Sequence, residues 1–161
     1  MNDTGLKGLF RRILTSSAGL TGHQQQLIRT SFEDLLRAQE TAAALFYGRL
    51  STLDPELGVL FKDQMKEQSL MAVMGTVVDN SRCLSGLFPA LRALGRRQDG
   101  YGVVDRDYDT VAAALIWTLK QGLGAGFTAE TREAWTVCYR ILSDEMKFAA
   151  SESKAPFLPP C

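Results

Sequence analysis

The sequence is poor in residues that bind metals or form disulfides. Its 161 residues include one histidine, His23, and three cysteines, Cys83, Cys138 and Cys161. A structural zinc site needs four closely spaced cysteine or histidine ligands, so we expect no metal site. No two cysteines have the C-x-x-C spacing, and an odd number of scattered thiols argues against a disulfide framework. Few, unpaired cysteines are typical of a reducing compartment, and we predict a cytoplasmic protein.

The sequence also lacks an excess of one charge and a long apolar run. Lys and Arg number 18, Asp and Glu number 18, and the net charge at pH 7 is zero. Without surplus positive charge we expect no nucleic-acid partner, because such proteins bind a phosphate backbone mainly through basic residues. The longest apolar runs, such as 111–117, are far shorter than the ~20 residues of a membrane helix. We therefore expect no transmembrane segment.

What the sequence does contain is helical periodicity. Apolar residues recur at spacings of three and four, beginning with Leu27, Ile28, Phe32 and Leu35, and this spacing gives a helix one apolar face. No segment alternates with the period of two that is typical of a strand. We predict an all-α protein of about seven to eight helices. The predicted helices cover residues 22–36, 40–52, 55–61, 63–80, 84–95 and 107–123, with a last helix that begins near 128.

The two ends of the chain differ from this helical part. Residues 4–15 combine five apolar side chains with three basic ones, which predicts an extra short amphipathic helix. The last residues contain three of the five prolines and cannot continue a helix. We therefore predict an N-terminal amphipathic extension over 1–20, one compact domain over 21–150, and a flexible Pro-rich tail over 151–161.

Several motifs follow one another along the predicted helices. They are Ala44-Leu-Phe-Tyr-Gly-Arg-Leu50, Leu53-Asp-Pro-Glu-Leu57, Leu60-Phe-Lys62, Leu87 to Arg97, Gly100-Tyr-Gly-Val103, Ala114 to Leu119 and Glu133 to Tyr139. In this order and at these separations, the segment from about 21 to 149 resembles bacterial single-domain haemoglobins and the globin domain of flavohaemoglobins. The resemblance implies a globin fold with a haem pocket, and it identifies the predicted domain over 21–150 as a globin domain.

One position departs from the pattern of that family. Its members place a proximal histidine, the ligand of the haem iron, at the end of the helix before a Gly-x-Gly-Val-like turn, and here that position holds Gln98. A neutral amide is a weak oxygen donor, whereas haem proteins use His, Cys, Met or Tyr. For this reason we expect as cofactor either none or haem without normal ligation.

The resemblance assigns roles to further residues of the pocket. Tyr47 matches the tyrosine that hydrogen-bonds bound oxygen in the distal pocket, and Phe61 matches the phenylalanine that wedges against the porphyrin. The distal position falls on Lys66 when counted back from the next helix, and on Gln68 or beyond when counted forward from Phe61.

Two tyrosines complete the predicted site. Tyr108 matches a tyrosine that orients the proximal histidine in flavohaemoglobin-like globins. Tyr101, like Lys66, is a possible unusual axial ligand for haem.

These residues predict a binding or sensory globin that is not an enzyme, since no nucleophile and base form a pair. Its pocket is haem-free or takes another apolar ligand, such as a fatty acid or a tetrapyrrole. The alternative is a haem-binding globin for oxygen or nitric oxide that has an unusual axial ligand. Globins commonly associate through their last two helices, so a homodimer is also predicted.

Overall fold

The structure is a computed structural model that describes residues 19–64, 70–100 and 102–150. Within these residues it contains seven α-helices, two short 3-10 helices and no strand, which confirms the predicted all-α fold. The predicted helix at 4–15 and the tail at 151–161 lie outside the described residues. The helices are α2 (Gly22–Leu36), α3 (Gln39–Leu53), α4 (Pro55–Gln64), α5 (Leu70–Asp79), η1 (Leu84–Leu87), α6 (Phe88–Gly100), α7 (Asp105–Leu123), η2 (Gly124–Gly126) and α8 (Ala129–Ala150).

Local polar residues start the helices where the sequence predicts them. The Thr21 hydroxyl accepts the backbone N–H of Gln24 at 3.1 Å, and the Gln24 side chain accepts the N–H of Thr21 at 3.1 Å. This reciprocal capping box satisfies two N–H groups that have no partner inside α2. Asp54 accepts the N–H of Leu57 at the start of α4, and Thr128 caps α8 in the same way.

The region predicted as one helix over 84–95 has a different form. It begins as the 3-10 turn η1, and α6 then continues five residues beyond Gly95 to Gly100. The predicted end of this helix at residue 95 is therefore wrong. Gly95 is buried where α6 crosses α8, and a Cβ atom there would clash with the carbonyl oxygen and the Cα of Met146. The missing side chain permits a close crossing of two backbones.

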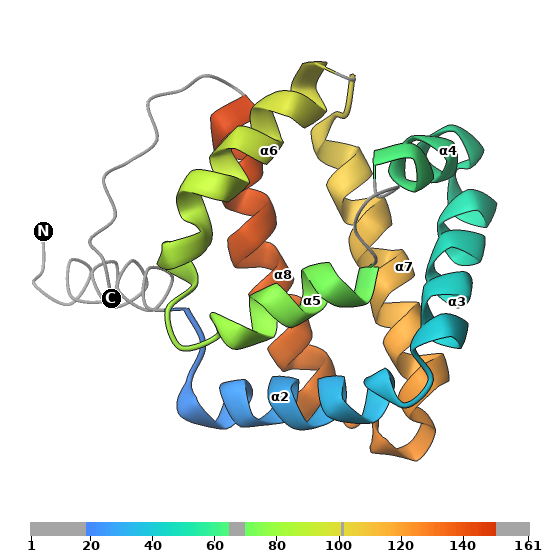
Figure 1. The fold of residues 1–161 in the computed structure, drawn as a ribbon, viewed down its shortest axis with the longest axis vertical. Helices are drawn as coiled ribbons and strands as arrows, with labels where there is room; N and C mark the ends of the chain where they lie inside the picture. Colours follow the sequence, from blue (N-terminus) through green and yellow to red (C-terminus); the bar gives the residue numbers. More distant parts are fainter. Residues whose placement is uncertain (1–18, 65–69, 101, 151–161) are drawn as a thin grey trace, which may run out of the picture.

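Helix α8 connects the two sides of the molecule. Figure 1 shows it running from α2 to α6, with α7 beside it and α3 and α4 beyond α7. Helices α2 and α6 both pack on α8, and α3 packs on α7. A continuous apolar core fills the centre, where each fully buried large aliphatic side chain stabilises the fold by roughly 1.5–3 kcal/mol. Its completely inaccessible members are Ile28, Leu50, Leu84, Ala114, Leu119 and Ala134.

The cysteines differ from the expectation of a chain without disulfides. Cys138 is a free, buried thiol on α8, but Cys83, which precedes η1, is disulfide-bonded. Sequence spacing could not reveal this, because a disulfide needs two Cα atoms to lie within about 7 Å in space. No helix in the described part of the chain is long and apolar enough to span a bilayer.

Candidate functional site

The structure describes four of the seven predicted site residues. Gln98 lies in the last turn of α6, Tyr47 on α3, Phe61 on α4 and Tyr108 on α7. For Gln98 only its place on the helix is described. The other three, Lys66, Gln68 and Tyr101, lie outside the described residues. The structure thus places the predicted residues on four different helices around the core.

Tyr47 and Phe61 border the core from neighbouring helices. Both are half-buried and pack against the main apolar cluster. The Tyr47 ring meets the Phe46 ring edge-on, with centroids 5.3 Å apart and planes inclined by 70°, an arrangement that aromatic quadrupoles favour. Burial raises the pKa of Tyr47 above its ordinary value. Its hydroxyl is therefore protonated at neutral pH.

Tyr108 is held in place by helix α8. Its side chain is buried, and its carbonyl oxygen accepts a hydrogen bond of 2.8 Å from the Tyr139 hydroxyl. The ammonium group of Lys147 lies 5.7 Å from the centroid of the Tyr108 ring, within the range of a cation–π contact. Burial, and then the charges of Tyr108 and Asp109, raise the pKa of Tyr139. Tyr139 is thus a neutral, fixed donor that joins α7 to α8.

Helix α6, which carries Gln98, is attached to α8 by an ion pair. Arg92 Nε lies 2.5 Å from Glu145 Oε1, and only 7% of the Glu145 side chain is exposed. Of the three arginines of α6, Arg92 is half-buried against α8, whereas Arg96 and Arg97 are exposed. The partner of Arg92 is 53 residues away in the sequence, so helical spacing alone could not reveal the pair.

The single imidazole of the chain lies at the surface. His23 begins α2, and its Nε2 lies 2.7 Å from Glu130 Oε2 in the first turn of α8. The exposed fractions of the two side chains are 68% and 71%. This partner explains the position of His23, and it leaves no imidazole in the interior of the molecule.

Three of the described sulfur side chains are packed in the core, whereas Met146 on α8 is half-buried and Cys83 is in a disulfide. Met71 and Met74 of α5 belong to the main apolar cluster, and Cys138 of α8 is fully buried. Burial raises the pKa of the Cys138 thiol to about 12, so the thiol stays protonated at neutral pH, whereas metals bind the thiolate. Among the described residues no three His, Cys, Asp or Glu side chains form a metal site.

Comparisons with known proteins agree with the predicted family. The globin family model matches residues 29–146. The chain is 30% identical to neuroglobin of Dissostichus mawsoni in an alignment 139 positions long that covers 76% of this chain and 87% of that protein. It is 27% identical to neuroglobin of Tetraodon nigroviridis in an alignment 143 positions long that covers 79% of this chain and 90% of that protein.

One solved structure is also similar in sequence. It is the closed form of the HGbRL globin domain, which is 30% identical and has a TM-score of 0.41, with 84% of this chain and 99% of that chain covered. The family match covers most of the chain, and the helices have the all-α arrangement that the family predicts. The chain therefore belongs to the globin family and has a globin fold.

Proposed function

We propose that this chain is a binding or sensory globin, not an enzyme, whose pocket holds no histidine-ligated haem. The observation that carries the proposal is the position of His23. The only imidazole of the chain is exposed and paired with Glu130 at the ends of α2 and α8. A histidine-ligated haem does not fit this set of donors, because no second imidazole exists to bind the iron.

The residue at the predicted proximal position supports the same conclusion. An amide oxygen such as that of Gln98 is a weak ligand for haem iron. Three sulfur donors do not replace it, since Met71 and Met74 pack in the core and the Cys138 thiol stays protonated. The pocket is then either filled by side chains or takes an apolar ligand that needs no iron–imidazole bond, such as a fatty acid or a tetrapyrrole.

The attachment of α6 supports a pocket that persists without an iron bond. The Arg92–Glu145 pair and the crossing at Gly95 hold α6 against α8 whatever Gln98 binds. In this proposal Tyr47, Phe61 and Tyr108 border the pocket, together with Lys66, Gln68 and Tyr101. The Tyr47 hydroxyl is the proposed hydrogen-bond donor to the ligand.

A second candidate function follows from membership of the globin family itself. Burial of a porphyrin in an apolar pocket is favourable by ~25 cal/mol per Å² even without an axial bond. In that case the protein is a haem-binding globin for oxygen or nitric oxide, and Tyr101 or Lys66 is the proposed axial ligand.

Haemin titration separates these two functions. We expect wild-type protein to purify without a strong Soret band and to show, with added haemin, either no binding or a spectrum without histidine-type ligation. Gln98→His should produce a sharp Soret band and a reversible carbon-monoxide complex. The matched control is Gln26→His, which adds an imidazole on the exposed face of α2 and should behave like wild type.

Two results would contradict the proposal. Wild-type protein that purifies with stoichiometric, tightly ligated haem would support the second candidate. A Gln98→His protein indistinguishable from the Gln26→His control would show that residue 98 does not face a usable pocket.

The cellular location and the oligomeric state remain predictions. We propose a cytoplasmic protein that forms a homodimer. Light scattering of the full chain tests the dimer, and a variant without residues 1–18 tests whether the amphipathic extension forms the interface.

A further inference from the structure

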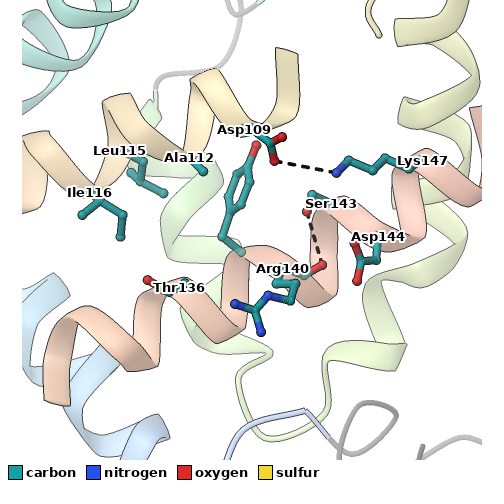
Figure 2. A pocket seen from close by; sticks show the side chains of 10 residues that line it. Asp109, Ala112, Leu115, Ile116, Thr136, Arg140, Ser143, Asp144 and Lys147 are labelled. Carbon is teal, nitrogen blue, oxygen red and sulfur yellow. Dashed lines mark hydrogen bonds and ion pairs between the residues drawn. The ribbon is translucent and has the colours of Figure 1, made fainter. Parts of the chain in front are cut away.

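A hollow lies between α7 and α8 and is formed by residues that the globin pocket does not use. Its volume is about 340 Å³, at the lower end of the range of small-molecule sites. Figure 2 shows Ala112, Leu115 and Ile116 along α7, and Arg140, Ser143 and Asp144 along α8. The α7 side of the hollow is thus apolar except for Asp109, and the α8 side carries charged residues.

Two small side chains explain why the helices leave space here. Ala112 of α7 and Ser143 of α8 both line the hollow, where larger residues would fill it. The Ser143 hydroxyl is already used, because it donates to the carbonyl oxygen of Arg140 at 3.2 Å. Leu115 is buried and Ile116 is half-buried, so the surface that remains open to a ligand is largely apolar.

The charges at the rim occur in two pairs of opposite sign. Lys147 lies 3.9 Å from Asp109 at one end of the hollow. Arg140 and Asp144 are one helical turn apart and both exposed, but the described residues provide neither of them with an ion pair. The hollow is therefore neutral overall and presents one free positive group beside one free negative group.

A ligand that complements this arrangement carries both charges close together and an apolar group beside them. We propose that the hollow binds a free α-amino acid with an apolar side chain. Its carboxylate contacts the Arg140 guanidinium, its ammonium contacts Asp144, and its side chain covers Ala112 and Ile116. A simple organic anion is less suitable, because Asp144 repels it as much as Arg140 attracts it.

Three probes of the same shape test the recognition of charge. They are L-phenylalanine, 3-phenylpropionate, which lacks the ammonium, and phenethylamine, which lacks the carboxylate. Each is titrated into the ¹⁵N-labelled full chain, and amide shifts are followed by NMR. We expect phenylalanine to shift the amides that border the hollow, with a millimolar dissociation constant because its ion pairs are exposed. The other two probes should bind about fivefold or more weakly.

Variants assign the two ends of the ligand. Arg140→Gln should weaken the binding of phenylalanine by about fivefold, and Asp144→Asn should do the same. Each substitution removes one exposed ion pair between the protein and the ligand. Ala112→Leu should abolish the shifts by filling the hollow. Arg132→Gln and Glu133→Gln are the matched controls, since they neutralise exposed charges of α8 outside the hollow and should leave binding unchanged.

Several outcomes would overturn the proposal. One is that phenylalanine leaves these amides unmoved, and another is that all three probes bind equally well. A third is that the shifts change with protein dilution instead of ligand, which would make this face an interface between two copies. Haem plays no part in the test, so its result is independent of the state of the globin pocket.

Discussion

Helix α8 packs at its two ends in two different ways. Near its start it meets α2 through side chains: Trp135 Nε1 donates to Ser31 Oγ at 2.8 Å, and Ser31 in turn donates to the Leu27 carbonyl at 2.6 Å. Near its end it meets α6 through a close backbone crossing at Gly95 and the Arg92–Glu145 pair. Figure 1 shows these two contacts at opposite ends of the helix.

The difference shows which contact can control the predicted pocket. The α2 contact is an ordinary core, in which buried polar groups are satisfied by neighbours. The α6 contact combines a close backbone approach at Gly95 with the Arg92–Glu145 ion pair, and α6 carries Gln98. In the globins that this chain resembles, an iron–histidine bond ties this helix to the haem. In the function proposed above, α8 provides this attachment instead, through Gly95 and the Arg92–Glu145 pair.

The largest expected effect comes from adding a methyl group to the α6 crossing. Gly95→Ala places a Cβ atom against the backbone of Met146, and we expect a loss of about 3 kcal/mol in the free energy of unfolding. Gly48→Ala is the control, because no atom lies within 4 Å of a Cβ there. That helix-interior exchange should stabilise the protein by about 0.5–1 kcal/mol. Urea unfolding measures both, and effects of the same sign would show that α6 does not depend on the crossing.

A slightly smaller loss is expected at the α2 contact. Ser31→Ala removes the acceptor of the Trp135 N–H. Trp135 is buried, with 3% of the residue exposed. A buried donor without a partner should cost about 2 kcal/mol. Thr30→Ala, one residue earlier and exposed, is the control and should change stability little. An equal effect of the two changes in thermal unfolding would contradict a role for this hydrogen bond.

The ion pair of the α6 contact should contribute less, because Arg92 can reach water. With 31% of its side chain exposed, Arg92 can be solvated when Glu145→Gln removes its partner, and we expect a loss of about 1 kcal/mol. Hydrogen exchange of the α6 amides should increase more than that of the α2 amides. Exchange that increases equally in both helices would show that the pair stabilises the whole domain and not the attachment of α6.

The smallest effect concerns pH and belongs to the α2 end of α8. Burial raises the pKa of Cys138 from 9.0 to about 12, so between these pH values the unfolded chain loses this proton more readily than the folded one. Stability must therefore fall as the pH rises from about 9 towards 12. At the onset of this fall, between pH 8 and pH 9, the contribution of this thiol should fall by about 0.4 kcal/mol.

The control for this prediction is Cys138→Ala. It should lower stability at pH 8 by removing buried sulfur, and it should also reduce the further loss between pH 8 and pH 9. Tyr139, whose pKa burial also raises, is present in both proteins and cancels in the difference. An unchanged pH dependence in chemical denaturation would show that Cys138 does not titrate differently on unfolding.

The parts of this protein that could be predicted from the sequence are those that neighbouring residues determine. Three helix caps are local: the side chains of Thr21, Asp54 and Thr128 each accept the backbone N–H of the residue three positions later. The apolar spacing within one helix likewise reveals which of its faces is buried. The ordered motifs were specific enough to identify the globin family, because they span most of the chain.

The contacts between residues that are distant in the sequence were decided only by the tertiary structure. The predicted helix ended at Gly95, whereas in the structure Gly95 lies inside α6 and packs against the backbone of Met146. The pairs Arg92–Glu145 and His23–Glu130 likewise join residues that lie far apart in the sequence. The hollow between α7 and α8 likewise depends on how two helix faces meet. Local sequence determines local hydrogen bonds and periodicity, but the partner of a side chain across the core depends on how all the helices pack together.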